Sequence, residues 1–236
     1  MKTRKTKWLS ILLAVVMCVS CIQPVHAADE SNSDQTGTNA TYYYNNNFDT
    51  VQDLSSSFTG AMYSQEFNAS QTAGHIKFQV GEGATEAQFT TALTDAEVKN
   101  ILVEVELSAT ETGLPSGALK LAGKNTADEA VAGNLIYFGG NRVYTTADRA
   151  SGTEIATVST SGFVKLGMML NVADGTLTSA DVYQFDAAYE SWEFLGTTAI
   201  GQSFANFTDV QLYAEEAGKA VLFDDLKVYS NEVSAT

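Results

Sequence analysis

The sequence predicts an all-β domain built as a two-sheet antiparallel β-sandwich. Residues 42–230 form a succession of short apolar or alternating runs, and Gly, Asn, Asp and Ser separate these runs. Short strands with frequent turn residues are typical of sandwiches. Helix signals are sparse: one capping-box pattern, Thr94-Asp95-Ala96-Glu97, predicts a single helical turn at most. The length of this region is sufficient for one hydrophobic core, so we expect a single domain.

Hairpin signals and alternation predict the individual strands. Residues 164–172 and 177–185 flank Asp174-Gly175, and residues 135–138 and 142–145 flank Gly139-Gly140-Asn141. Each pair is therefore expected to form an antiparallel hairpin. The other predicted strands are residues 75–80, 101–107, 192–197, 210–214 and 220–229.

The first 27 residues have the pattern of a secretory signal peptide. A basic start, an apolar stretch over residues 8–22 and Val25-His26-Ala27 follow one another. The apolar stretch is shorter than the roughly 18 residues that a membrane-spanning helix needs, and no other segment approaches that length. An alternative is lipid anchoring at Cys21, although Cys18 stands where a lipoprotein motif prefers Leu. The sequence thus predicts bacterial export, to the extracellular space or the cell surface.

Four regions follow from composition. Residues 1–27 are the predicted signal peptide, residues 28–41 a polar flexible leader, residues 42–230 the sandwich and residues 231–236 a tail. The leader contains DESNSDQTGTNAT, which has no apolar periodicity.

The charge balance restricts the partners. The chain has 13 Lys and Arg against 28 Asp and Glu, with a net charge of −15, and the mature chain is still more acidic because the signal peptide is basic. Such a surface repels nucleic acid and anionic membranes. Both cysteines, Cys18 and Cys21, lie in the signal peptide, so the mature chain has no disulfide. Neutral glycans, cations and basic partners remain as ligand classes.

Three motifs together carry a family resemblance. They are Asn47-Phe48-Asp49, the hairpin over residues 166–185 followed by Trp192-Glu193-Phe194-Leu195-Gly196, and the closing Phe223-Asp224-Asp225-Leu226-Lys227-Val228-Tyr229. This combination resembles the concanavalin A-like, laminin-G-like jelly-roll domain of bacterial secreted carbohydrate-binding or polysaccharide-processing proteins. The resemblance implies a jelly roll, a polysaccharide or glycan partner, and first and last strands that lie side by side.

Two groups of residues are candidates for catalysis. Glu104 and Glu106 share one face of a predicted strand, about 6.6–6.8 Å apart along the backbone, a separation at which two carboxylates can divide acid and base roles. Laminarinase-like glucanases carry Glu-x-Asp-x-Glu on such a strand, whereas Ser108 here replaces the third acid. The competing interpretation is an ordinary polar face, and we expect no hydrolase or lyase activity on common β-glucans or pectins. His75, helped by Arg142 or Tyr144, is a weaker candidate for a lyase base.

Aromatic residues are the candidates for ligand binding. Trp192, Tyr183 and Tyr189 fall on one predicted hairpin with Phe185 and Phe194. Sugar rings pack their apolar faces on such side chains, while polar groups such as those of Glu104 and Glu106 bind the hydroxyls. The alternative is that Trp192 fills the sandwich core.

The two adjacent aspartates of the last strand suggest a structural calcium ion. Alternation would place Asp224 on the same side as Leu222 and Leu226, which we expect to be buried, and a buried carboxylate needs a partner. If the first and last strands are neighbours, Asp49 and Asn47 would lie near Asp224 and could complete an oxygen cage for calcium. The alternative is that Asp224 accepts hydrogen bonds from backbone amides and Asp225 faces water.

These observations predict a secreted, non-catalytic, lectin-like module that binds a polysaccharide or cell-surface glycan. One alternative is a glycoside hydrolase or polysaccharide lyase on the same scaffold. Another is a surface or adhesion domain that binds protein.

Overall fold

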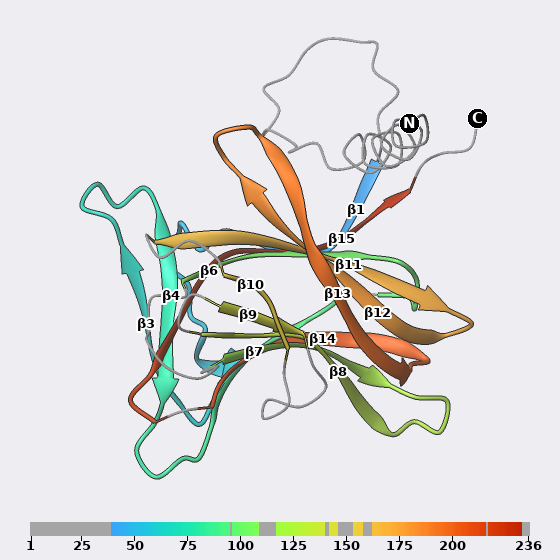
Figure 1. The fold of residues 1–236 in the computed structure, drawn as a ribbon. Coiled ribbons are helices and arrows are strands. Elements are labelled where there is room, and N and C mark those ends of the chain that lie inside the picture. The colour runs from blue at the N-terminus through green and yellow to red at the C-terminus, as the bar shows by residue number, and fades with distance from the viewer. Residues whose placement is uncertain are drawn as a thin grey trace, which may run out of the picture.

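Two antiparallel sheets pack face to face, which confirms the predicted all-β sandwich (Figure 1). The computed structural model describes residues 39–94, 96–108, 117–139, 142–145, 153–157, 162–215 and 217–232. The predicted signal peptide and most of the predicted leader lie outside the described residues. Within the described part of the chain, no helix has the length and apolarity needed to cross a membrane.

Sheet A has the strand order β13-β12-β11-β6-β15-β4-β3, and β1 also pairs with β15; its β6, β11 and β15 form the upper layer in Figure 1, and β3 and β4 stand upright at the left. Its strands are β1 (Asn39–Asn46), β3 (Ala61–Phe67), β4 (Gly74–Val80), β6 (Leu102–Ser108), β11 (Phe163–Ala173), β12 (Thr176–Asp186), β13 (Ser191–Ser203) and β15 (Ala220–Glu232).

Sheet B has the order β10-β9-β8-β7-β14-β5-β2, and its β7, β8 and β14 form the lower layer in Figure 1. Its strands are β2 (Phe58–Thr59), β5 (Ala87–Ala92), β7 (Gly117–Lys124), β8 (Ala130–Gly139), β9 (Arg142–Thr145), β10 (Thr153–Thr157) and β14 (Asn206–Ala214).

The core lies between the sheets and is made by alternate residues of each strand. In β4, Ile76 and Phe78 are fully buried while their neighbours are partly exposed. Phe89 of sheet B meets Phe223 of sheet A with ring centroids 4.8 Å apart, so aromatic contacts join the two layers. The strand period of two therefore places one face of each sheet inside and leaves the other face for function.

Both predicted hairpins are present. β11 pairs with β12 across Asp174 and Gly175, whose φ angles of 50° and 72° fit a two-residue turn with left-handed backbone. β8 pairs with β9. The predicted helical turn at residues 94–97 is wrong: the described residues there are not helical, and the helical element of the described chain is a single 3-10 turn, Ser55–Ser57.

A β-bulge in the last strand overturns the predicted sidedness of the aspartate pair. Asp224 is opposite Glu106, but the next paired residue, Lys227, is opposite Glu104, so β15 holds one extra residue. Asp225 has a left-handed φ of 47°. Because the extra residue resets the alternation, Phe223 and Leu226 both face the core, and Asp224 faces outward.

The first and last strands pair, as the family resemblance implied. Tyr42 of β1 is opposite Tyr229 of β15, and the pairing extends from Asn39, opposite Glu232, to Asn46, opposite Leu226. β1 therefore begins inside the segment that the sequence predicted as leader.

Candidate functional site

The outer face of sheet A, which is turned away from sheet B, gathers charged and aromatic side chains from six strands. Inward-facing residues such as Val103 and Val105 fill the core, so alternation sends the residues between them outward. We call this surface the A face; it includes His75, Glu104, Glu106, Lys165, Tyr183, Trp192, Phe194, Asp224, Asp225, Lys227 and Tyr229.

Glu104 is the most deeply placed carboxylate on the A face. It is 6% exposed. It accepts a short hydrogen bond from the Tyr229 hydroxyl and lies 3.3 Å from Lys165 Nζ. Burial and the charge of Glu104 raise the pKa of Tyr229 above its usual value, so this hydroxyl stays protonated and donates. Glu104 is thus satisfied by partners from β11 and β15.

Asp225, the bulge residue, shares the same lysines. Its oxygens lie 2.8 Å from Lys227 Nζ and 3.6 Å from Lys165 Nζ. Although burial lowers the pKa of Lys227, the hydrogen bond that Lys227 donates to Asp225 and the charge of Asp225 raise this pKa overall. The two lysines are therefore engaged by Glu104 and Asp225.

Glu106 and Asp224 are the carboxylates that keep a proton most readily. Burial is the first cause that raises the pKa of Asp224, to about 7, and the charges of Glu106, Asp225 and Asp49 add to it. The hydrogen bond from the Asp225 amide to Asp224 Oδ1, 2.7 Å long, only partly offsets this. Burial and the charge of Asp225 also raise the pKa of Glu106. Near pH 7, Asp224 is therefore able to take up and release a proton.

His75 lies on the A face, but not with the partners that the sequence suggested. Its Nε2 is 3.5 Å from Glu66 Oε2, and its ring centroid is 5.2 Å from that of Phe163. Arg142 and Tyr144 are on β9 of sheet B, so the structure does not bring them to His75.

Trp192 is on the A face and not in the sandwich core, which overturns the alternative that it fills the core. It is 9% exposed because it lies over Gly167, where an added Cβ would be 2.8 Å from the indole ring. Phe185 packs against it with centroids 5.3 Å apart. The ammonium of Lys165 lies 5.9 Å from the indole centroid, within range of a cation–π contact.

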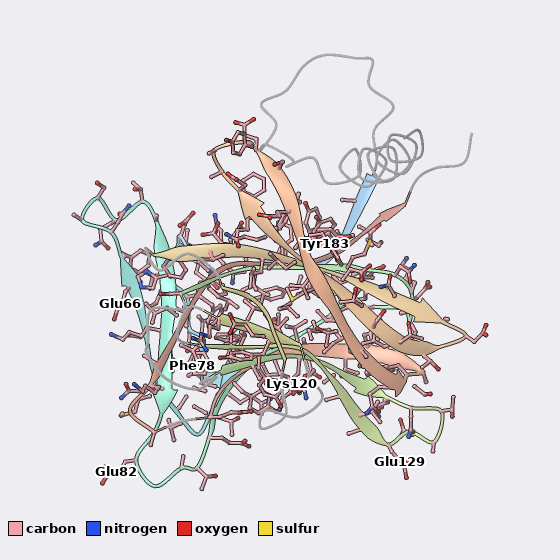
Figure 2. The ribbon with its side chains drawn as sticks, viewed as in Figure 1. Glu66, Phe78, Glu82, Lys120, Glu129 and Tyr183 are labelled. Carbon is pink, nitrogen blue, oxygen red and sulfur yellow. The ribbon has the colours of Figure 1, made fainter. Side chains whose placement is uncertain are left out.

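The accessible aromatic surface is next to Trp192. Phe194 is 55% exposed, and its ring centroid is 5.5 Å from that of Tyr183. Figure 2 labels Tyr183 beside the upper sheet. Tyr189, in the turn between β12 and β13, is more exposed still. We call Phe194 and Tyr183 the aromatic platform.

The proposed calcium ligands lie close together, but they are engaged in other contacts. Asp49 Oδ1 accepts a hydrogen bond from the Gly74 amide, and Oδ2 accepts one from the side-chain nitrogen of Asn47. Asp224 accepts the Asp225 amide. Within the described residues, no group of three or more His, Cys, Asp or Glu side chains is arranged to hold a metal ion.

Calcium binding nevertheless remains a prediction, which a thermal melt tests. If calcium ties the chain ends together, a chelator should lower the melting temperature of the wild type but not that of Asp224→Asn. An unchanged midpoint in the wild type would contradict it.

The sequence analysis missed the lysines and the tyrosine that complete the charge network. Lys165, Lys227 and Tyr229 come from strands far from Glu104 in the sequence. The sequence did contain one indication of them: Lys227 and Tyr229 alternate with the apolar residues Leu226 and Val228, so they were expected to point outward beside the aspartate pair. Reading that signal required the bulge to be known.

Comparisons with known proteins place the fold but not a family. No protein-family model matches the sequence, and none of the curated proteins is significantly similar to it. A carbohydrate esterase from the Shiga toxin-encoding bacteriophage phi24B is similar in structure, with a TM-score of 0.55 and 12% identity over 82% of this chain and 100% of that chain. Cellulose induced protein Cip1 gives a TM-score of 0.51 and 15% identity over 78% of this chain and 96% of that chain.

A sialidase is also similar, with a TM-score of 0.51 and 12% identity over 82% of this chain, but the match spans only 19% of the sialidase. At these identities the likeness establishes the fold. It confirms the predicted concanavalin-like jelly roll.

Proposed function

We propose that this chain is a carbohydrate-binding domain and that the A face is its binding surface. The observation that carries the proposal is the position of the aromatic platform, Phe194 and Tyr183, beside the charge network around Glu104. An exposed ring, packed on a half-buried one and bordering fixed polar groups, is the combination that sugar recognition uses.

The chemistry of a sugar matches both parts of this surface. The apolar face of a pyranose ring packs on Phe194, because about half of the surface of this side chain is open to solvent. The hydroxyls then point toward Glu104, Lys165 and Glu106, whose charged groups make stronger hydrogen bonds than neutral ones. Trp192 is mostly covered, so its role is to hold Lys165 and the platform in place.

The names of two similar structures agree with this ligand class, because one is a carbohydrate esterase and one a sialidase. We also infer export to the extracellular space or cell surface, from the signal-peptide pattern of residues 1–27. Free secretion after cleavage at Ala27 is favoured over lipid anchoring at Cys21.

A glycan array probed with residues 28–236 tests the proposal. We expect saturable binding to at least one polysaccharide, and Phe194→Ala should weaken it by about tenfold while the circular dichroism spectrum is retained. Tyr213→Ala, on the outer face of sheet B, is the matched control and should bind like the wild type. Absence of glycan binding, combined with capture of a defined protein partner, would favour the adhesion alternative instead.

Glycan hydrolysis is a second candidate, favoured by the proton-retaining pair Asp224 and Glu106. These side chains come from neighbouring strands in register, so one could protonate a glycosidic oxygen while the other acts as the base or nucleophile. Product analysis after incubation with each bound glycan decides between the functions. Turnover lost in both Asp224→Asn and Glu106→Gln would make the chain an enzyme; binding without products would leave it a lectin-like module.

A further inference from the structure

A second aromatic group lies on the A face at a distance from the platform. Tyr42 of β1 is 39% exposed, and its ring centroid is 5.3 Å from that of Tyr229. Tyr229 is fixed underneath by its hydrogen bond to Glu104. Tyr42 is thus an exposed ring that packs on a more buried ring, Tyr229, in the same way that exposed Phe194 packs on Tyr183.

One register row connects the two aromatic groups across six strands. Phe194 is opposite Tyr183, Tyr183 is opposite Gly167, and Gly167 is opposite Glu104. The row continues from Glu104 to Lys227 and from Lys227 to Asn45 of β1. Tyr42 flanks the end of this row through its pairing with Tyr229.

The composition of the row changes from aromatic to polar and back. Gly167 has no side chain, and Glu104 is held low by Lys165 and Tyr229. Lys227 is drawn toward Asp225. The Trp192 ring lies over Gly167, so the middle of the row offers a mostly covered ring and hydrogen-bonding groups, whereas more exposed rings stand at both ends.

We propose that the A face binds an internal stretch of a linear, neutral polysaccharide that runs across the strands from Phe194 and Tyr183 to Tyr42. This inference rests on the proposed function and names its ligand class. Four strand spacings separate β12 from β1, a distance of about 19 Å, which is the length of about four sugar units.

The charges favour a neutral chain over an anionic one. Lys165 and Lys227 are already engaged by Glu104 and Asp225, so they are not free to bind carboxylate or sulfate groups. Glu106 and Asp224 place two further carboxyl groups close to the row, and these are negative when deprotonated. A uronic acid or sulfated sugar would meet net repulsion here.

A length series tests this inference. Isothermal titration of residues 28–236 with cello-, xylo- and laminari-oligosaccharides of two to six units should show affinity for one series that rises about tenfold or more up to four or five units and then levels. Tyr42→Ala should remove this gain and leave disaccharide binding unchanged, whereas Phe194→Ala should weaken binding at every length. Tyr42→Phe, which keeps the ring, should behave like the wild type.

Asn45→Arg is the second variant, because Asn45 is exposed at the end of the row and a longer side chain there obstructs the ligand without touching the core. It should also abolish the gain with length. Affinity that does not depend on length, or binding of anionic glycans only, would overturn this inference and leave the proposed function intact. Binding of no glycan at all would overturn both.

Discussion

The outer faces of the two sheets are both polar, but their polar groups are satisfied in different ways. On sheet B the contacts are local: Asp209 of β14 accepts hydrogen bonds of 2.6 Å from both Thr208 and Gln211, and Gln211 accepts one from the Tyr213 hydroxyl. Lys120, labelled beside the lower sheet in Figure 2, lies 3.8 Å from the Tyr213 ring centroid.

On the A face the contacts are long-range. Glu104 is held by residues from two other strands, and Asp224 and Glu106 retain raised pKa values. A face whose groups satisfy one another along a single strand is a stable solvated surface. A face that concentrates charge from several strands keeps an electrostatic cost that a ligand or a proton can relieve.

The largest effect is expected at Gly167. Gly167→Val should displace Trp192, because an added Cβ would be within 2.8 Å of its ring, and should lower the free energy of unfolding by about 2–3 kcal/mol. Chemical denaturation measures this. The matched control on sheet B is Ala132→Val, an exposed strand position where we expect a change of about 0.5 kcal/mol or less. If both substitutions lower the free energy of unfolding equally, the A face is no more tightly packed than the outer face of sheet B.

Next in size is the hydrogen bond beneath Tyr42. Tyr229→Phe removes the donor to buried Glu104 and should cost about 1–2 kcal/mol of stability, since the carboxylate is left with Lys165 alone. Tyr213→Phe removes the hydroxyl that donates to Gln211 on the outer face of sheet B, which is more exposed, and should lower the free energy of unfolding by about 0.5 kcal/mol. Urea unfolding of both variants gives the comparison, and a smaller loss for Tyr229→Phe would contradict it.

The pH dependence of stability should come from the A face. Asp224 has a folded pKa raised to about 7, so between its ordinary value and 7 the folded chain binds a proton that the unfolded chain has lost. Its contribution to stability is fully present below the ordinary value of 3.8, falls as the pH rises, and is lost above 7. Asp224→Asn should therefore gain about 1 kcal/mol of stability relative to the wild type between pH 4 and pH 8, after allowance for partial exposure.

Denaturation at both pH values measures this difference. Asp209→Asn, the sheet B control, weakens two hydrogen bonds and should be destabilised at both. A gain for Asp224→Asn that does not change with pH would contradict the assignment.

The smallest effect is expected at Lys120. Lys120→Met removes a cation–π contact at the surface and should change stability by about 0.5 kcal/mol. It should not alter glycan binding, because it lies on sheet B. A clear loss of affinity would move the binding surface to sheet B.

The sequence predicted those features that depend on local patterns. The outward placement of Glu104 and Glu106 follows from alternation in one strand, and the turn at Asp174 and Gly175 follows from residue type. The bulge at Asp225 does not, because a left-handed aspartate has no distinct sequence signal, and it reversed the sidedness of Asp224.

The position of Trp192 was ambiguous for a different reason. A large apolar residue in a strand fits either face, and here the choice depends on Gly167, a glycine two strands away in sheet A. The charge network has the same origin, since Lys165 and Tyr229 meet Glu104 only after the sheet has assembled. Sequence patterns give the face of a residue, but not its partners from distant strands.

The place of β15 in sheet A has a consequence for how the chain folds. This last strand lies in the interior of the sheet, between β6 on one side and β4 and β1 on the other. Until residues 220–232 have been synthesised, β6 cannot be joined to β4 and β1, because β15 is the strand that pairs with all three. Sheets with such distant pairings form slowly. Sheet A is therefore expected to stay largely unassembled until residues 220–232 have been synthesised, and for the proposed export this would leave the domain unfolded and able to pass through a translocon that accepts only unfolded polypeptide.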